Sequence, residues 1–232
     1  MWLRLLHCTR SIRITLYDIT NGMRYILPLL ADWANGLFAL MAAAYITQTE
    51  VVWWHVPVAL LLSHLPDIDA VPELLRRGKV SASAEHARDH RTFLHFPIIS
   101  IPLGIITAVL FGFWGWVILL AIVLHLVNDL YGTGWGLPLF WPFSARHYKV
   151  LGRRANRLYR ILQKEGDWDR LPEPEKRLRL VVSWDESEFS SYINRWGVDD
   201  WIDLWYLRLN WISVVEYALF ICACVLLLAT FV

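Results

Sequence analysis

Four stretches of the sequence carry histidine and aspartate at spacings that suit a metal ion. They are HLPDID at 64–69, HARDHRTFLH at 86–95, HLVND at 125–129, and Asp32 within an apolar stretch. His86 and His90, like His125 and Asp129, are four residues apart, so each pair would share one helical face. Imidazole together with carboxylate favours Zn, Mn or Fe, because Ca and Mg use oxygen ligands almost alone. We therefore expect one or more divalent metal ions, with Zn favoured and Mn or Fe as alternatives.

The candidate metal ligands are the histidines and aspartates of these stretches: His64, Asp67, Asp69, His86, His90, His95, His125, Asp129 and Asp32. A metal ion at such a site lowers the pKa of bound water and neutralises charge developing on a phosphate or carbonyl oxygen, so hydrolysis is the favoured reaction class. Candidates for supporting the reaction are Asp69, His90 and Arg91. His7 and His55 are expected to be packing residues and are left out of the site.

Each stretch also has a simpler interpretation when it is taken alone. PDID can be an acidic turn in which Pro66 stops a helix, and 86–95 can be a solvated loop at the membrane surface. Arg88 and Arg91 can bind a substrate phosphate or merely anchor the positive side of a membrane protein. Together, these simpler interpretations require three clusters of His and Asp to meet at one membrane face by chance, so the metal site is preferred.

Composition favours a protein embedded in a membrane. Hydrophobic residues make up 56% of the 232 residues and there are 14 tryptophans, which is unusual for a soluble domain. The formal net charge of +1 gives no general attraction to nucleic acid, so a nucleic-acid partner is not expected. Three cysteines are too few and too unevenly placed for a disulfide framework.

Five apolar stretches approach the roughly 20 residues that a spanning helix needs. They lie at 25–46, 51–65, 96–111, 114–130 and 211–232. We therefore predict an all-α, polytopic helical bundle with about five spans. The basic loops fall on one side of these spans, which places the N-terminus in the cytoplasm and the C-terminus outside. This topology brings all four His and Asp stretches to the cytoplasmic face.

The same pattern divides the chain into three parts. Residues 25–143 form a membrane-embedded domain with the metal site, 144–210 an interfacial segment in the cytoplasm, and 211–232 a C-terminal transmembrane helix. Residues 144–163 mix arginines with leucine and tyrosine in a basic amphipathic pattern, which we expect to lie on the anionic leaflet. The Trp-rich segment 178–210 contains no interpretable motif.

Over residues 28–142 the chain resembles the LexA-regulated, YdjM-like family of inner-membrane proteins predicted to be metal-dependent hydrolases, distant relatives of zinc-dependent phospholipase C. The family pattern is a PDID-like turn, HR-x-x-x-H, H-x-x-x-D and G-x-x-L-x-x-P, matched here at 66–69, 90–95, 125–129 and 136–142. Members commonly have a histidine in the first span, where this chain has Asp32. The resemblance implies a metal-dependent hydrolase of the bacterial inner membrane.

The function expected from these observations is a membrane-bound hydrolase that uses metal-activated water on a phosphoester or lipid-like substrate. A lipid phosphoester is favoured because the predicted site lies at headgroup depth beside a basic interfacial helix. Membrane lipids are the expected partners, and the oligomeric state is left open. The alternatives are an ion or metal transporter, in which intramembrane Asp and His form the pathway, and a membrane scaffold without catalysis.

Overall fold

The computed structural model describes residues 25–77 and 91–231. In that part of the chain, three helices of 19 residues are long and apolar enough to cross a membrane: α2 (Leu29–Thr47), α6 (Phe113–Tyr131) and α12 (Trp211–Ala229). Each is about 28 Å long, close to the thickness of the hydrocarbon core. The helices α3 (His55–Leu62) and α5 (Pro97–Phe111) have 8 and 15 residues. The membrane-helical prediction is therefore confirmed, whereas the count of five full-length spans is not.

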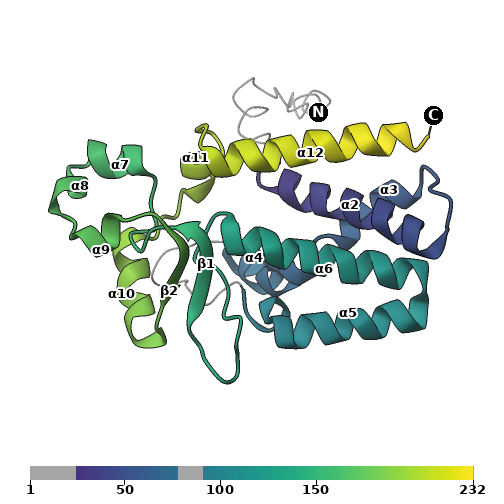
Figure 1. The fold of residues 1–232 in the computed structure, drawn as a ribbon, viewed down its shortest axis with the longest axis horizontal. Helices are drawn as coiled ribbons and strands as arrows, with labels where there is room; N and C mark the ends of the chain where they lie inside the picture. The colour runs from purple at the N-terminus through teal and green to yellow at the C-terminus, as the bar shows by residue number, and fades with distance from the viewer. Residues whose placement is uncertain (1–24, 78–90, 232) are drawn as a thin grey trace, which may run out of the picture.

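The long helices lie side by side, with α2 in contact with α3, α6 and α12, and α5 packed along α6 (Figure 1). Asp32 in the first turn of α2 hydrogen-bonds His125 near the end of α6, so these two helices are antiparallel. Asn128 of α6 likewise reaches Glu216 near the start of α12. The start of α2, the end of α6 and the start of α12 therefore meet at one end of the bundle, which we call the polar end.

The rest of the bundle is held together by small and branched apolar side chains. Ala39, Ala43, Ala59 and Ala121 are fully buried where α2, α3 and α6 meet. A Cβ atom added at Gly115 would overlap the carbonyl oxygen of Thr107, so α5 and α6 touch through their backbones. Small residues allow this close approach, which lipid-embedded helices use for van der Waals packing.

Two short helical turns bring further polar residues to the polar end. The 3-10 helix η1 (Pro66–Ala70) follows α3 and leads into α4 (Val71–Arg77), and η3 (Phe93–His95) directly precedes α5. Pro66 occupies the first position of η1, where the missing N–H costs no helical hydrogen bond. Because η1 contacts η3, the aspartates of PDID face the last histidine of the 86–95 stretch.

Residues 147–205 form a small folded module at the polar end, where β1 contacts α6. Its elements are β1 (His147–Gly152), α7 (Tyr159–Lys164), α8 (Asp167–Arg170), α9 (Glu173–Lys176), β2 (Arg179–Trp184), α10 (Glu186–Trp196) and α11 (Trp201–Trp205). The two strands are antiparallel, with Lys149 opposite Val182. Trp184, Phe189 and Trp196 are among its buried core residues.

This module corrects the prediction of a basic interfacial helix at 144–163. The first half of that segment is strand β1, and helix α7 includes only Tyr159–Lys164. The strand pairs with β2, which lies almost thirty residues further along the chain, so local periodicity could not identify it. The Trp-rich segment 178–210 is likewise ordered, because it contributes β2, α10 and α11.

Candidate metal centre

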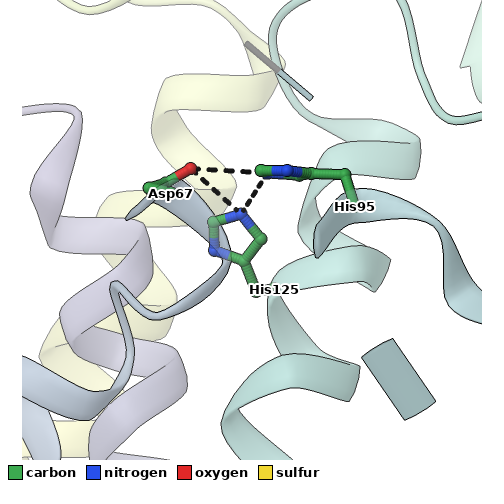
Figure 2. Close-up of side chains that lie close together, drawn as sticks. All are labelled: Asp67, His95 and His125. Carbon is green, nitrogen blue, oxygen red and sulfur yellow. Dashed lines mark hydrogen bonds and ion pairs between the residues drawn. The ribbon is translucent and has the colours of Figure 1, made fainter. Parts of the chain in front are cut away.

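Three side chains from three separate elements form a nearly equilateral triangle at the polar end (Figure 2). Nε2 of His95 lies 3.3 Å from Nε2 of His125, and Oδ1 of Asp67 lies 3.4 Å from each of these nitrogens. A tetrahedral ion with bonds of about 2.1 Å spaces its ligands about 3.4 Å apart. The triangle therefore has the size and the donor atoms of three ligands of one ion.

The outer nitrogen of each imidazole is held by a second aspartate. Nδ1 of His125 lies 2.8 Å from Oδ1 of Asp32, and Nδ1 of His95 lies 3.0 Å from Oδ2 of Asp69. Asp69 is itself fixed because the same oxygen accepts hydrogen bonds from the backbone N–H and hydroxyl of Thr92. A carboxylate behind each imidazole places the proton on Nδ1 and turns Nε2 towards the centre, as in many metal sites.

Asp129 contributes a fourth oxygen beside the triangle. Its Oδ2 lies 3.5 Å from Nε2 of both His95 and His125, is buried, and has no hydrogen-bond partner in the described chain. Its Oδ1 pairs with Nη2 of Arg91 at 2.5 Å, and Arg91 also donates to the carbonyl oxygen of Thr133. An oriented buried oxygen without a partner is costly unless it binds a cation or a proton.

The charges around the centre favour a cation. Four aspartates, Asp32, Asp67, Asp69 and Asp129, converge there, whereas Arg91 is the cationic side chain that pairs with one of them. Desolvation disfavours the charged form of His95, but hydrogen bonds with Asp67 and Asp69 outweigh it and raise the pKa of this imidazole. The carboxylates thus stabilise positive charge at the triangle, and a bound metal would replace protons there.

His64 has a different environment from the other two histidines. Its Nε2 accepts a hydrogen bond of 3.1 Å from the indole N–H of Trp33, and its Nδ1 lies 3.8 Å from Oδ2 of Asp32. His64, Asp32 and Asp67 form a second group close enough to hold an ion. However, a neutral ring that accepts at Nε2 carries its proton on Nδ1, so His64 presents a hydrogen-bond donor on the side of Asp32.

The centre opens into a cavity of about 950 Å³ between the polar end and the module. Asp67, His125 and Arg91 line it, whereas His95 is fully buried behind them. Much of the remaining lining is apolar and aromatic, with Ile68, Phe96, Trp135, Trp141, Trp201 and Trp205 among the contributing residues. The cavity can therefore accept a molecule with a polar part at the centre and an apolar part beside it.

The structure brings together seven of the predicted ligands: Asp32, His64, Asp67, Asp69, His95, His125 and Asp129. His86 and His90 lie outside the described residues. His55 is buried at the opposite end of α3 from His64, against the rings of Trp54 and Trp114 at 4.2 and 5.2 Å. Residue spacing does not reveal which imidazole nitrogen a carboxylate reaches. Asp32 and Asp69, which contact Nδ1 atoms, therefore could not be separated in advance from Asp67, which contacts Nε2 atoms.

Trp33, Thr92 and Thr133 also belong to the site, and sequence analysis did not identify them. Each acts through a hydrogen bond to a charged or titratable neighbour. Trp33 and Thr92 are adjacent in sequence to Asp32 and Arg91. This adjacency to candidate site residues is the signal that could have singled them out.

The model of the YdjM inner membrane protein family matches residues 33–164, more than half of the chain. The matched region contains all three residues of the triangle, and Asp32 lies immediately before it. No curated protein and no solved structure matches the chain. These comparisons do not show the distant relation to zinc-dependent phospholipase C. The extent of the family match, together with the apolar helices, establishes that the chain belongs to the YdjM inner membrane protein family.

Proposed function

We propose that this protein is a membrane-embedded, metal-dependent hydrolase that acts on the phosphoester of a lipid or lipid-like molecule. The triangle of Asp67, His95 and His125 carries the proposal, because its spacing suits one divalent cation. Two imidazoles and a carboxylate match the ligand set of many catalytic zinc sites, with Mn or Fe as alternatives. When bound there, the cation would supply Lewis acidity and lower the pKa of a coordinated water.

The surrounding residues would orient the ligands and donate hydrogen bonds to the substrate. Asp32 and Asp69 accept from the Nδ1 atoms and so fix the direction of both imidazoles. His64 carries its proton on Nδ1 and lines the cavity, which suits it to donate a hydrogen bond to an oxygen of the substrate. Arg91 holds Asp129 in place and brings positive charge to the side of the cavity where a phosphate would lie.

The position of the cavity supports an amphiphilic substrate. His125 lies about 9 Å, six residues, before the end of α6 at Tyr131, so the centre is close to the headgroup layer. Phe96 and Trp141 line the cavity and stack with ring centroids 4.8 Å apart, which gives an apolar surface near the polar centre. We place the polar end in the cytoplasm, because Arg76 and Arg77 of α4 and the arginines of the module lie on that side.

The alternative of an ion or metal transporter receives less support from the bundle. The region between α2, α3 and α6 beyond the polar end is filled by apolar residues, including Leu40, Ala43 and Val117, all fully buried. An ion pathway needs polar or hydrated positions along its length, and these positions are apolar and packed. The alternative of a scaffold without catalysis does not explain why a carboxylate contacts Nδ1 of each imidazole.

Purified protein reconstituted in vesicles of phosphatidylglycerol and phosphatidic acid tests the proposal. We expect about one equivalent of Zn, Mn or Fe by elemental analysis, and release of a water-soluble phosphorus compound detected by ³¹P NMR. His125→Ala should lose the metal and the reaction, whereas His55→Ala, a buried histidine at the other end of the bundle, should retain both. A folded protein without metal, or His125→Ala with full activity, would contradict the proposal.

A further inference from the structure

A second cavity, of about 660 Å³, lies beside the start of α12 and apart from the metal centre. Its walls come from the end of β1, the loop leading into α7, and the stretch from Trp205 to Ile212. Asn156 and Trp205 line both cavities and form part of the wall between them. No residue of the metal triangle is among those that line this second cavity.

All the charged residues that line this cavity in the described chain are cationic: Lys149, Arg153, Arg157, Arg160 and Arg208. Two of them are engaged elsewhere. Arg153 donates to the carbonyl oxygen of Lys176 at 2.8 Å, and Arg157 pairs with Glu165 at 2.8 Å. Arg160 and Arg208 are exposed and have no ion pair among the described residues, so their guanidinium groups are available to an anion.

Lys149 lies at the inner wall of the same cavity and is only 2% exposed. Its Nζ donates to the carbonyl oxygen of Gly134 and to Oδ1 of Asn156, both at 3.0 Å, so both acceptors are uncharged. Desolvation and the nearby charge of Arg91 lower the pKa of Lys149 to about 7. Because both acceptors of Nζ are uncharged, an anion in this cavity would stabilise the charged form of the amine.

In the proposed orientation, the residues around the cavity suit a position at the membrane surface. Trp211 begins α12, one of the three helices that can span a membrane, and lines the cavity together with Leu209, which is 76% exposed. Tryptophan is enriched at the boundary between lipid and water, and basic pockets beside spans on the cytoplasmic side bind anionic headgroups. The cavity thus combines cationic groups for a phosphate with apolar side chains for the adjoining acyl chains.

We propose that this second cavity binds the headgroup of an anionic membrane phospholipid. Arg160 and Arg208 contact the phosphate, and Leu209 and Trp211 lie along the first part of the acyl chains. The bound lipid is a ligand of the protein and is distinct from the substrate of the metal centre. It holds the module against the bilayer beside the start of α12.

Native mass spectrometry of the full chain in detergent tests this proposal, with phosphatidylglycerol as the probe and phosphatidylcholine as the neutral lipid. We expect phosphatidylglycerol to bind and phosphatidylcholine to be retained much less. The double variant Arg160→Gln/Arg208→Gln should bind phosphatidylglycerol about 10- to 30-fold more weakly, given the usual contribution of each basic residue at an anionic surface. Arg208→Lys should retain most of the binding because it keeps the charge.

The matched control is Arg177→Gln/Arg179→Gln, which removes two exposed arginines that do not line the cavity. This control should bind phosphatidylglycerol within about twofold of the wild type. Equal loss of binding in both double variants would overturn the proposal, because it would indicate attraction by net charge alone. Displacement of the lipid by millimolar inorganic phosphate would also overturn it, since the site would then recognise a free anion.

Discussion

Replacing Asp32 by asparagine isolates the contribution of a carboxylate that supports the metal centre without belonging to the triangle. The change keeps the size of the side chain but removes the charge that faces Nδ1 of His125 at 2.8 Å in a buried environment. The asparagine amide can also present its NH₂ group to Nδ1, which would favour the wrong tautomer of the ring. Both effects weaken Nε2 as a ligand.

The expected size of the effect follows from the role of Asp32 as a supporting group. Loss of such a partner typically lowers metal affinity about 10- to 100-fold, or about 1.4 to 2.7 kcal/mol. Replacing His125 by alanine removes a ligand and should cost more. Competition between the purified protein and a fluorescent zinc chelator in detergent would give the two dissociation constants.

Asp200→Asn is the matched control, because Asp200 lines the same cavity but is exposed on the side of the module. This variant should bind zinc as the wild type does, and melting temperatures of all variants would establish that they fold. An Asp32→Asn protein with affinity within threefold of the wild type would refute the orienting role. A loss as large as that of His125→Ala would refute it too, because Asp32 would then be a ligand.

Three further predictions concern the ligands, the module and the topology. In His125→Ala, the metal affinity measured by chelator competition should fall by more than about 100-fold. His55→Ala should keep its metal, as elemental analysis would measure. Desolvation opposes ionisation of Glu188, but a backbone N–H at the start of α10 and the guanidinium of Arg154 lower the pKa of Glu188. The ionised Glu188 side chain therefore contributes about 1 kcal/mol to the free energy of unfolding above the ordinary carboxyl pKa. This contribution is lost as the pH falls through the lowered pKa, so the melting temperatures of the wild type and Glu188→Gln should converge in acid. A reporter fused at the C-terminal end should behave as periplasmic and one inserted near residue 166 as cytoplasmic, and the opposite result would contradict the proposed orientation.

Local spacing was sufficient to predict part of the metal centre. His125 and Asp129 are four residues apart on α6, and both present an atom to His95. The apolar runs also predicted α2, α6 and α12, because a helix in lipid must satisfy its own backbone and so requires a long apolar sequence. These features depend on residues that are close in sequence.

Features that depend on distant partners could not be predicted in this way. Lys149 belongs to a segment that reads as a basic amphipathic surface, yet it is buried by the pairing of β1 with β2 and by its hydrogen bond to Gly134. The bounds of α3 differ from the predicted stretch 51–65 for a local reason, because the α-helix ends at Leu62 and the chain turns into η1 at Pro66. For β1, pairing with a distant strand decides between conformations that the local pattern leaves similar in energy.

The short length of α5 has a consequence for the bilayer in the proposed membrane arrangement. With 15 residues, α5 is about 22 Å long, whereas the hydrocarbon core is about 30 Å thick. Ile106, Val109 and Leu110, in the second half of α5, are exposed, so in a bilayer they would face acyl chains. Hydrophobic mismatch of this size is relieved when the leaflets thin beside the short helix. Since α5 begins two residues after His95, such a thinned region would adjoin the metal centre and bring the phosphate of the proposed lipid substrate closer to it.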